Sequence, residues 1–151
     1  MDDLDRIMLV MDEAFAPEYG EAWNRRQVSD ALVMPNTRYG LSTAEGRVNV
    51  RSTDTVAGFY LSRSILDEEE LLLFAISPAF RRRGLGHALM ERFVAEARSN
   101  GMKRLFLEMR AGNPAGHLYE AHGFVAVGRR PHYYRTPDGT RLDAISHAVD
   151  L

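Results

Sequence analysis

The chain has 151 residues, of which 45% are hydrophobic and 26% are charged, and its formal net charge is −2 at pH 7. This length and composition predict one globular domain over residues 1–151 and argue against disordered, collagen-like and coiled-coil proteins. The absence of cysteine excludes disulfide scaffolds, thiol nucleophiles and cysteine zinc sites, and the balanced charge argues against a general nucleic-acid-binding protein.

The N-terminus and the hydropathy pattern predict a cytoplasmic protein. Residues 1–5 are acidic, whereas a secretory signal begins with basic residues and continues with an apolar run. No apolar segment approaches the length of about 18 residues that a membrane span needs. We therefore expect neither a membrane nor a nucleic acid as a partner.

The N-terminal part of the chain predicts two helices. Apolar residues recur at helical spacing over residues 4–15, behind the candidate N-caps Asp2 and Asp3. A second helix is predicted over residues 21–34, with apolar side chains along one side.

Strands are predicted over most of the next forty residues. Both alternating sets of residues 56–61 are apolar or small, which indicates a strand buried on both faces. Residues 48–54 are interpreted as a loop or an extended hairpin, and Asp67–Glu70 as a polar turn. The apolar run at residues 71–76 predicts a central strand covered on both faces.

The second half alternates helices and strands. A long helix follows the central strand and ends at Asn100-Gly101, where glycine supplies the left-handed position. A strand is predicted over residues 104–109, then a short helix starting at Asn113-Pro114, with Asn113 as N-cap. Residues 124–128 and 143–149 are predicted as two final strands, joined by a Tyr- and Arg-rich excursion. This order predicts an α/β domain with a mixed sheet and helices on both faces.

The segment Arg-Arg-Arg-Gly-Leu-Gly at residues 81–86 lies between a predicted strand and a predicted helix. Glycines let backbone N–H groups approach an anion, and the N-terminus of a helix contributes the positive end of its dipole, so this arrangement favours phosphate. The segment is neither a Walker A loop, which ends in Gly-Lys-Ser/Thr, nor a dinucleotide fingerprint, which needs three glycines. The alternative is a basic surface turn with a tight glycine bend.

A series of short motifs resembles the GCN5-related N-acetyltransferase (GNAT) superfamily. Arg81-x-x-Gly84-x-Gly86, after a buried strand, is similar to the acyl-CoA pyrophosphate loop of that superfamily. Further motifs resemble its bacterial ribosomal-protein alanine N-acetyltransferase branch: Leu107-Glu108-Met109-Arg110-Ala111-x-Asn113, Leu118-Tyr119-Glu120-x-x-Gly123-Phe124, Arg129-Arg130, Tyr133-Tyr134, Asp138-Gly139 and Asp143-Ala144. The resemblance covers about residues 65–149.

Two features depart from the family pattern. The spacing from Asn113 to Tyr119 is one residue shorter than in the family, which bears on the direction in which Tyr119 points. The family's first strand usually precedes the first helix, whereas this chain begins almost at that helix. A missing edge strand would leave the sheet edge exposed.

The resemblance implies a single-domain GNAT fold with a mixed, mostly antiparallel sheet. It implies transfer of an acetyl group from acetyl-CoA to the N-terminal amine of a protein, in this branch a ribosomal protein, without a metal. The implied cofactor wedges between two splayed central strands, where the main chain of Ala75 and Ile76 pairs with the pantetheine arm and supplies an oxyanion N–H. The other implied cofactor-binding residues are Arg81, Arg82, Arg83, Gly84, Leu85, Gly86, His87 and Asn113.

Two side chains are candidates for catalysis. Glu108 lies in an otherwise apolar strand, where a carboxylate is costly unless it is paired or functional, and it is the candidate base. The alternative is an ion pair with Arg104 or Arg110. Tyr119 is the candidate acid, because a phenol with a pKa of about 10 suits protonation of a leaving thiolate. The alternative is a core tyrosine with a hydrogen-bonded hydroxyl.

The candidate acceptor-binding residues are fewer. Glu68, in the acidic segment, is a candidate for attracting a cationic peptide terminus, and the alternative is a solvated turn. Arg130, Tyr133 and Tyr134 are candidates for the wall of a peptide groove, and the alternative is strand pairing. The histidines show no metal-ligand spacing and are predicted to be surface or structural residues: His117, His122, His132 and His147. A small-molecule amine as acceptor, and a non-catalytic acyl-CoA-binding module, remain the rival hypotheses.

Overall fold

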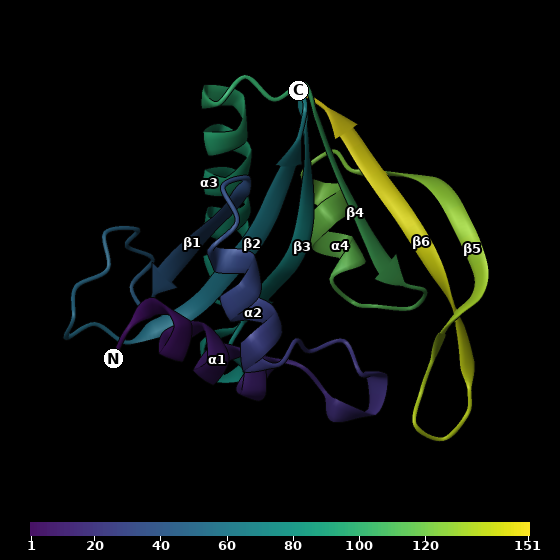
Figure 1. Ribbon diagram of the computed structural model, residues 1–151, viewed down its shortest axis with the longest axis horizontal. Helices are drawn as coiled ribbons and strands as arrows, with labels where there is room; N and C mark the ends of the chain where they lie inside the picture. Colours follow the sequence, from purple (N-terminus) through teal and green to yellow (C-terminus); the bar gives the residue numbers. More distant parts are fainter.

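The computed structural model describes the backbone of residues 1–151 and every side chain except that of Glu18 (Figure 1). The order of helices and strands predicted from the sequence is confirmed, with two short 3₁₀ turns, η1 and η2, added. The elements are α1 (Asp3–Ala14), η1 (Pro17–Tyr19), α2 (Arg25–Leu32), β1 (Thr37–Thr43), β2 (Val56–Ile65), β3 (Glu68–Ile76), η2 (Pro78–Phe80), α3 (Leu85–Ser99), β4 (Arg104–Arg110), α4 (Gly116–Ala121), β5 (Val125–Arg135) and β6 (Arg141–Asp150). Among the helices described, none is long and apolar enough to cross a membrane.

The strands form one mixed sheet in the order β1-β2-β3-β4-β6-β5. β3 and β4 run parallel, whereas the other neighbouring strands are antiparallel. β3 and β4 are paired at Glu68–Arg104, Glu69–Leu105 and Glu70–Phe106. Beyond these pairs the two strands move apart, as Figure 1 shows, so the sheet opens at its centre.

Helices cover both faces of the sheet, as the sequence predicted (Figure 1). On one face, Ile7 and Met11 of α1 and Val28 of α2 are buried together with Phe59 and Leu61 of β2. On the other face, α3 packs against the same strand, and the rings of Phe93 and Tyr60 lie 5.0 Å apart between centroids. The prediction that residues 56–61 form a strand buried on both faces is therefore confirmed. Residues 48–54 form a loop.

The prediction of a polar turn at Asp67–Glu70 is wrong. Glu68, Glu69 and Glu70 begin β3, and the chain reverses at the two residues before them. Glu69 is only 1% exposed, and its carboxylate binds Arg38 at 3.1 Å and accepts a hydrogen bond from Ser62 at 2.7 Å. These partners come from β1 and β2, so the one buried carboxylate of the run, that of Glu69, is satisfied inside the sheet.

Two helices start later than predicted. α2 begins at Arg25, because Asn24 and Gln27 form a capping box around its first turn. Residues 21–23 therefore belong to the connection between α1 and α2. α4 begins at Gly116, and Asn113 instead holds the preceding turn, where its Oδ1 accepts the N–H of Ala115 at 3.0 Å.

The predicted Tyr- and Arg-rich excursion is part of a long hairpin. β5 and β6 pair from Val125–Ala148 to Arg135–Arg141, and a turn at residues 136–140 joins them. β5 is exposed along almost its whole length and forms one edge of the sheet, and β1 forms the other edge.

Candidate active site

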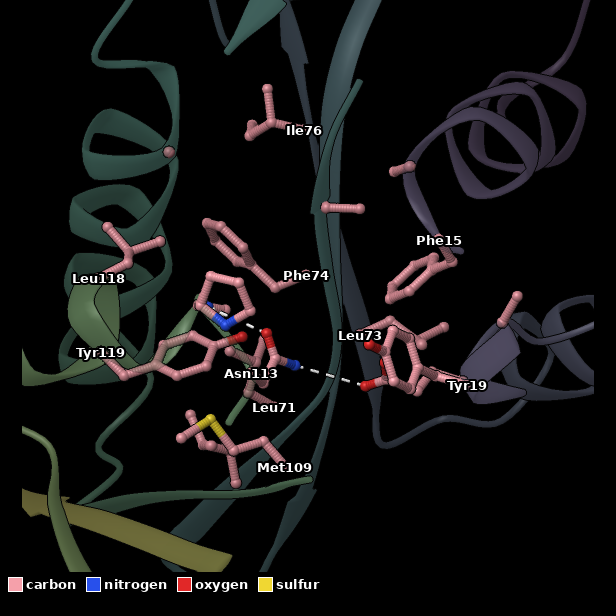
Figure 2. A pocket seen from close by; sticks show the side chains of 18 of the residues that line it. Phe15, Tyr19, Leu71, Leu73, Phe74, Ile76, Met109, Asn113, Leu118 and Tyr119 are labelled. Carbon is pink, nitrogen blue, oxygen red and sulfur yellow. Dashed lines mark hydrogen bonds between the residues drawn. The ribbon is translucent and has the colours of Figure 1, made fainter. Parts of the chain in front are cut away.

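A cavity of about 880 Å³ occupies the opening between β3 and β4. Its walls are residues 71–76 of β3, residues 107–110 of β4, the loop before α3, the turn before α4, and the connection between α1 and α2. Figure 2 shows Phe74, Leu118 and Tyr119 on one side of β3, and Phe15 and Tyr19 on the other. The two sides are called the α4 side and the α1 side below.

The backbone of β3 provides a hydrogen-bond donor at the cavity. Ser77 donates its N–H to Ala57 at 2.7 Å, and Gly58 lies opposite Ile76. In an antiparallel pair these positions alternate, so Gly58–Ile76 is a non-hydrogen-bonded pair and the backbone N–H of Ile76 points away from β2, into the opening. The same alternation directs the backbone of Ala75 toward Phe59 of β2. Of the two predicted residues, Ile76 therefore supplies the free N–H, and Ala75 contributes its side chain to the lining.

The predicted phosphate loop forms the end of the cavity beside the N-terminus of α3. Gly84 is the N-cap of α3 and has a φ of +77°, a left-handed conformation that glycine adopts without steric cost. The first N–H groups of α3 have no intrahelical acceptor, and Gly84, Leu85, Gly86 and His87 all line the cavity. This arrangement supplies the backbone donors and the positive helix end that phosphate prefers.

The three arginines of the loop have different environments. Arg81 donates to the carbonyls of Ile76 and Ala14, each at 3.1 Å, so its side chain ties the loop to β3 and to the end of α1. Arg83 lies outside the lining and stacks on Phe80 at 5.5 Å. Arg82 lines the cavity. Of the three arginine side chains expected to bind phosphate, only that of Arg82 therefore lines the cavity without another partner among the contacts described above. The backbone N–H groups of the loop are the other available donors.

His87 joins the loop to α4. Its Nδ1 lies 3.0 Å from Nε2 of His122, which is the C-cap of α4. Burial lowers the pKa of His122, and the adjacent His87 lowers it further. The pair therefore holds the start of α3 against the end of the helix that carries Tyr119.

Glu108 of β4 lines the cavity, and it is paired with neither of the arginines named from the sequence. Its Oε2 lies 3.0 Å from Nη2 of Arg130 on β5 and accepts a hydrogen bond from Ser146 at 3.4 Å. Arg104 binds Glu68 at 3.8 Å, and Arg110 binds a different carboxylate. The carboxylate of Glu108 is therefore oriented by the β5–β6 hairpin.

Tyr119 of α4 points into the cavity from the α4 side (Figure 2). Its ring packs edge-on against Phe74 and Phe124, with centroid distances of 6.3 and 6.0 Å. Burial raises the pKa of Tyr119, and the charge of Glu21 raises it further. Tyr119 is 7% exposed and belongs to the hydrophobic core, and among the described residues no side chain hydrogen-bonds to its hydroxyl.

Glu21 is a site residue that the sequence reasoning missed. It accepts a hydrogen bond from Nε of Arg110 at 2.9 Å and one from Nδ2 of Asn113 at 3.4 Å, and the second bond is drawn in Figure 2. The guanidinium of Arg110 also lies 3.6 Å from the ring centroid of Tyr19. These contacts join the α1–α2 connection to the end of β4 across the opening. They link residues about ninety positions apart, which no local pattern could reveal.

The predicted acceptor-binding residues divide into two groups. Tyr134 lines the cavity, and burial raises its pKa, with the charges of Glu108 and Glu21 adding to the rise. Tyr133 is 52% exposed, lies outside the lining, and stacks under Arg130 at 4.5 Å. Glu68 lies at the opposite end of β3 from Ile76 and outside the lining, so the structure does not place it in the site.

Comparison with known proteins identifies the family. Residues 8–124 match the model of the Acetyltransferase (GNAT) family. The chain belongs to the GNAT family. It is 35% identical over 133 residues to the [Ribosomal protein bS18]-alanine N-acetyltransferase of Salmonella typhimurium, covering 86% of this chain and 89% of the relative. The crystal structure of the Escherichia coli ribosomal-protein-S18-alanine N-acetyltransferase superposes with a TM-score of 0.81 at 31% identity, covering 98% of this chain and 87% of that one.

As a GNAT protein the chain is an acetyl-CoA-dependent N-acetyltransferase. The structure of an acetyltransferase of Salmonella typhimurium with its cofactor acetyl-CoA has a TM-score of 0.58 and 25% identity, covering 64% of this chain and 59% of that one. The cavity fits such a cofactor, because unpaired edges of β3 and β4 face each other at one end and the start of α3 presents free N–H groups at the other. Among the described residues, no group of three or more His, Asp or Glu side chains could hold a metal ion.

Proposed function

We propose that this enzyme acetylates the N-terminal α-amine of a protein, and that the acceptor is a ribosomal protein. The observation that carries the proposal is one cavity that brings together the N-terminus of α3, the Ile76 N–H, the Glu108 carboxylate and the Tyr119 hydroxyl. The names of the Salmonella and E. coli relatives, which match over most of both chains, support the acceptor. A ribosomal acceptor is consistent with a cytoplasmic enzyme.

Acetyl-CoA, when bound, supplies an acetyl group activated as a thioester. The backbone donors of Gly84–His87 and the Arg82 side chain would hold its phosphates, and residues 71–76 its pantetheine arm. The N–H of Ile76 would donate to the thioester oxygen while negative charge develops there, as an oxyanion donor does.

The chain's own groups would move the two protons of the reaction. Glu108 would accept the proton of the α-ammonium, directly or through a water. This task is easier for an α-amine, whose pKa is about 7.7–8.0, than for a lysine, whose pKa is about 10.4. Tyr119 would give its proton to the departing thiolate, and the second proton that the nitrogen loses as the amide forms would restore the Tyr119 hydroxyl. The raised pKa of Tyr119 keeps that proton in place until the thiolate forms.

Tyr119→Phe tests the acid. The substitution keeps the ring contacts with Phe74 and Phe124, so we expect unchanged CoA affinity and an unchanged melting temperature. We expect kcat to fall about a hundredfold, the low end of the range for a general acid, because a phenol with a raised pKa gives up its proton less readily. Thiol release measures kcat. In the wild-type enzyme, we expect no loss of activity from deprotonation of Tyr119 between pH 6 and 9, because its raised pKa keeps the hydroxyl protonated there. A tyrosine that only packs in the core would leave kcat unchanged.

The nature of the acceptor is tested with two peptides of one sequence. One has a free N-terminus and blocked lysines, and the other has a blocked N-terminus and free lysines. At pH 7 about 10–20% of an α-amine is neutral, against less than about 0.1% of a lysine, so we expect the first peptide to be acetylated at least a hundredfold faster. Mass spectrometry should place the acetyl group on the first residue, with a small residue such as alanine preferred there.

Other outcomes identify the rivals. Acetylation mainly of lysine in the second peptide would overturn the proposed acceptor and leave the fold and the enzyme class intact. Thiol release with a polyamine or an amino sugar, and none with either peptide, would indicate a small-molecule acceptor. CoA binding in a thermal-shift assay without turnover of any amine would indicate a non-catalytic module.

A further inference from the structure

The β5–β6 hairpin contains a bulge at residues 131–133. Arg130 lies opposite Ala144 and Tyr134 lies opposite Leu142, so three residues of β5 face the single residue Asp143 of β6. His132, at the centre of the bulge, has a φ of +54°, which is a strained conformation for a residue with a β-carbon. The first residue of the bulge is a proline, which has no N–H to give to β6.

Asp143 contacts the centre of the bulge and the part of β5 before it. Its Oδ1 accepts the N–H of His132 at 2.9 Å, and its Oδ2 pairs with the guanidinium of Arg129. Its backbone carbonyl accepts the N–H of Ala111 at 2.8 Å, just beyond β4. The N–H of His132 and the charge of Arg129 lower the pKa of Asp143, so the carboxylate is ionised at neutral pH. The side chain of Asp143 therefore holds the strained residue, and the backbone of Asp143 is anchored beside the end of β4.

The bulge decides which residues of β5 reach the active site. Without the two extra residues, His132 would lie opposite Leu142, where Tyr134 lies now. With the bulge, Tyr134 lies opposite Leu142 and lines the cavity. The place of Tyr134 therefore depends on a backbone conformation that is unfavourable by itself and is held by Asp143.

We propose that Asp143 is a positioning residue for the acceptor: through the bulge at residues 131–133 it directs Tyr134 into the cavity. The proposal rests on the proposed function, because it assigns the acceptor wall to this hairpin. It requires only that Tyr134 contacts the acceptor, and it holds whichever amine is the acceptor.

The test compares three variants with wild type, using the amine that wild type acetylates fastest. Asp143→Ala removes both side-chain contacts, and we expect kcat/KM for the acceptor to fall about tenfold to hundredfold, as a displacement of about 1 Å does. CoA affinity, measured by titration calorimetry, should stay within about twofold. Asp143→Asn keeps an oxygen for the His132 N–H and should retain most activity. Adding His132→Gly to Asp143→Ala should restore part of it, because glycine adopts the left-handed conformation freely.

Asp138→Ala is the matched control. Asp138 lies in the same hairpin and accepts hydrogen bonds from the Thr140 N–H, at 2.9 Å, and from the Thr136 hydroxyl, but it does not touch the bulge. We expect it to lower the melting temperature with little change in acceptor kcat/KM. The proposal is overturned if Asp143→Ala leaves acceptor kcat/KM unchanged, lowers it no more than Asp138→Ala, or weakens CoA binding in parallel. Amide hydrogen exchange reports on the bulge without any acceptor: Asp143→Ala should speed exchange at His132, and unchanged exchange there would overturn the proposal even if the acceptor assignment failed.

Discussion

Glu108→Gln is expected to lower turnover by roughly 10²–10⁴-fold, the contribution of a general base. Glutamine has nearly the shape of glutamate and keeps an oxygen for Arg130 and Ser146, so the hairpin contact and the cavity shape should survive. What is lost is the ability to accept the ammonium proton. Thiol release with a free-N-terminus peptide, followed from pH 6 to 9, measures the loss, and CoA affinity should stay near wild type.

Arg130→Ala separates the base from the ion pair. It removes the partner that lies 3.0 Å from Glu108 but leaves the carboxylate, so we expect a loss of less than about tenfold, typical of one exposed charge pair. Equal losses in the two variants would show that the ion pair, and not proton transfer, is what the reaction needs. Near-normal turnover of Glu108→Gln across the whole pH range would remove Glu108 from the mechanism.

Gly84→Asp should weaken CoA binding about tenfold to hundredfold. The new carboxylate stands where the phosphates are expected, and it opposes them with like charge and hinders the approach of the backbone N–H groups. The loss of one charge-assisted hydrogen bond, about 1.5–3 kcal/mol, corresponds to that change in the dissociation constant. Titration calorimetry with CoA measures it.

Gly101→Asp is the matched control for this variant. Gly101 has a φ of +79°, close to the +77° of Gly84, and a β-carbon at either position meets no atom within 4 Å. Both variants therefore carry the same strain of a left-handed aspartate, but Gly101 lies beyond the other end of α3. We expect unchanged CoA affinity in Gly101→Asp. If Gly84→Asp also binds CoA normally, the phosphate site lies elsewhere.

The sequence was sufficient for the elements whose signals are local. The apolar run of β3, the glycine-rich loop and the Asn100-Gly101 end of α3 are each recognised from a few consecutive residues. The residues predicted for the cofactor side lie together around one cavity, apart from Arg83. The placement of these residues depends on local backbone structure, which sequence patterns predict well.

What the sequence did not show depends on contacts between distant segments. By its sequence, the acidic run at Glu68–Glu70 is typical of a solvated turn. Only the fold shows that Arg38 and Ser62, on two other strands, bind the carboxylate of Glu69. The bulge at residues 131–133 and the Glu21–Arg110 pair likewise become visible only after the strands are aligned. The pairing of Glu108 with Arg130 has the same cause: the sequence suggests the nearby Arg104 or Arg110 as ion-pair partners, whereas Arg130 comes close only through the fold.

The parallel pair β3–β4 has a consequence for how such an enzyme can change its acceptor. Parallel neighbours need a crossover, here α3, and that single β3–α3–β4 unit supplies both the opening in the sheet and the helix end beside it. Other lining residues come from outside this unit: Phe15, Tyr19 and Glu21 precede it, and Tyr134, proposed above to contact the acceptor, follows it. Grafting these two outer segments from another family member onto this chain should therefore exchange acceptor preference while the affinity for CoA stays that of the recipient.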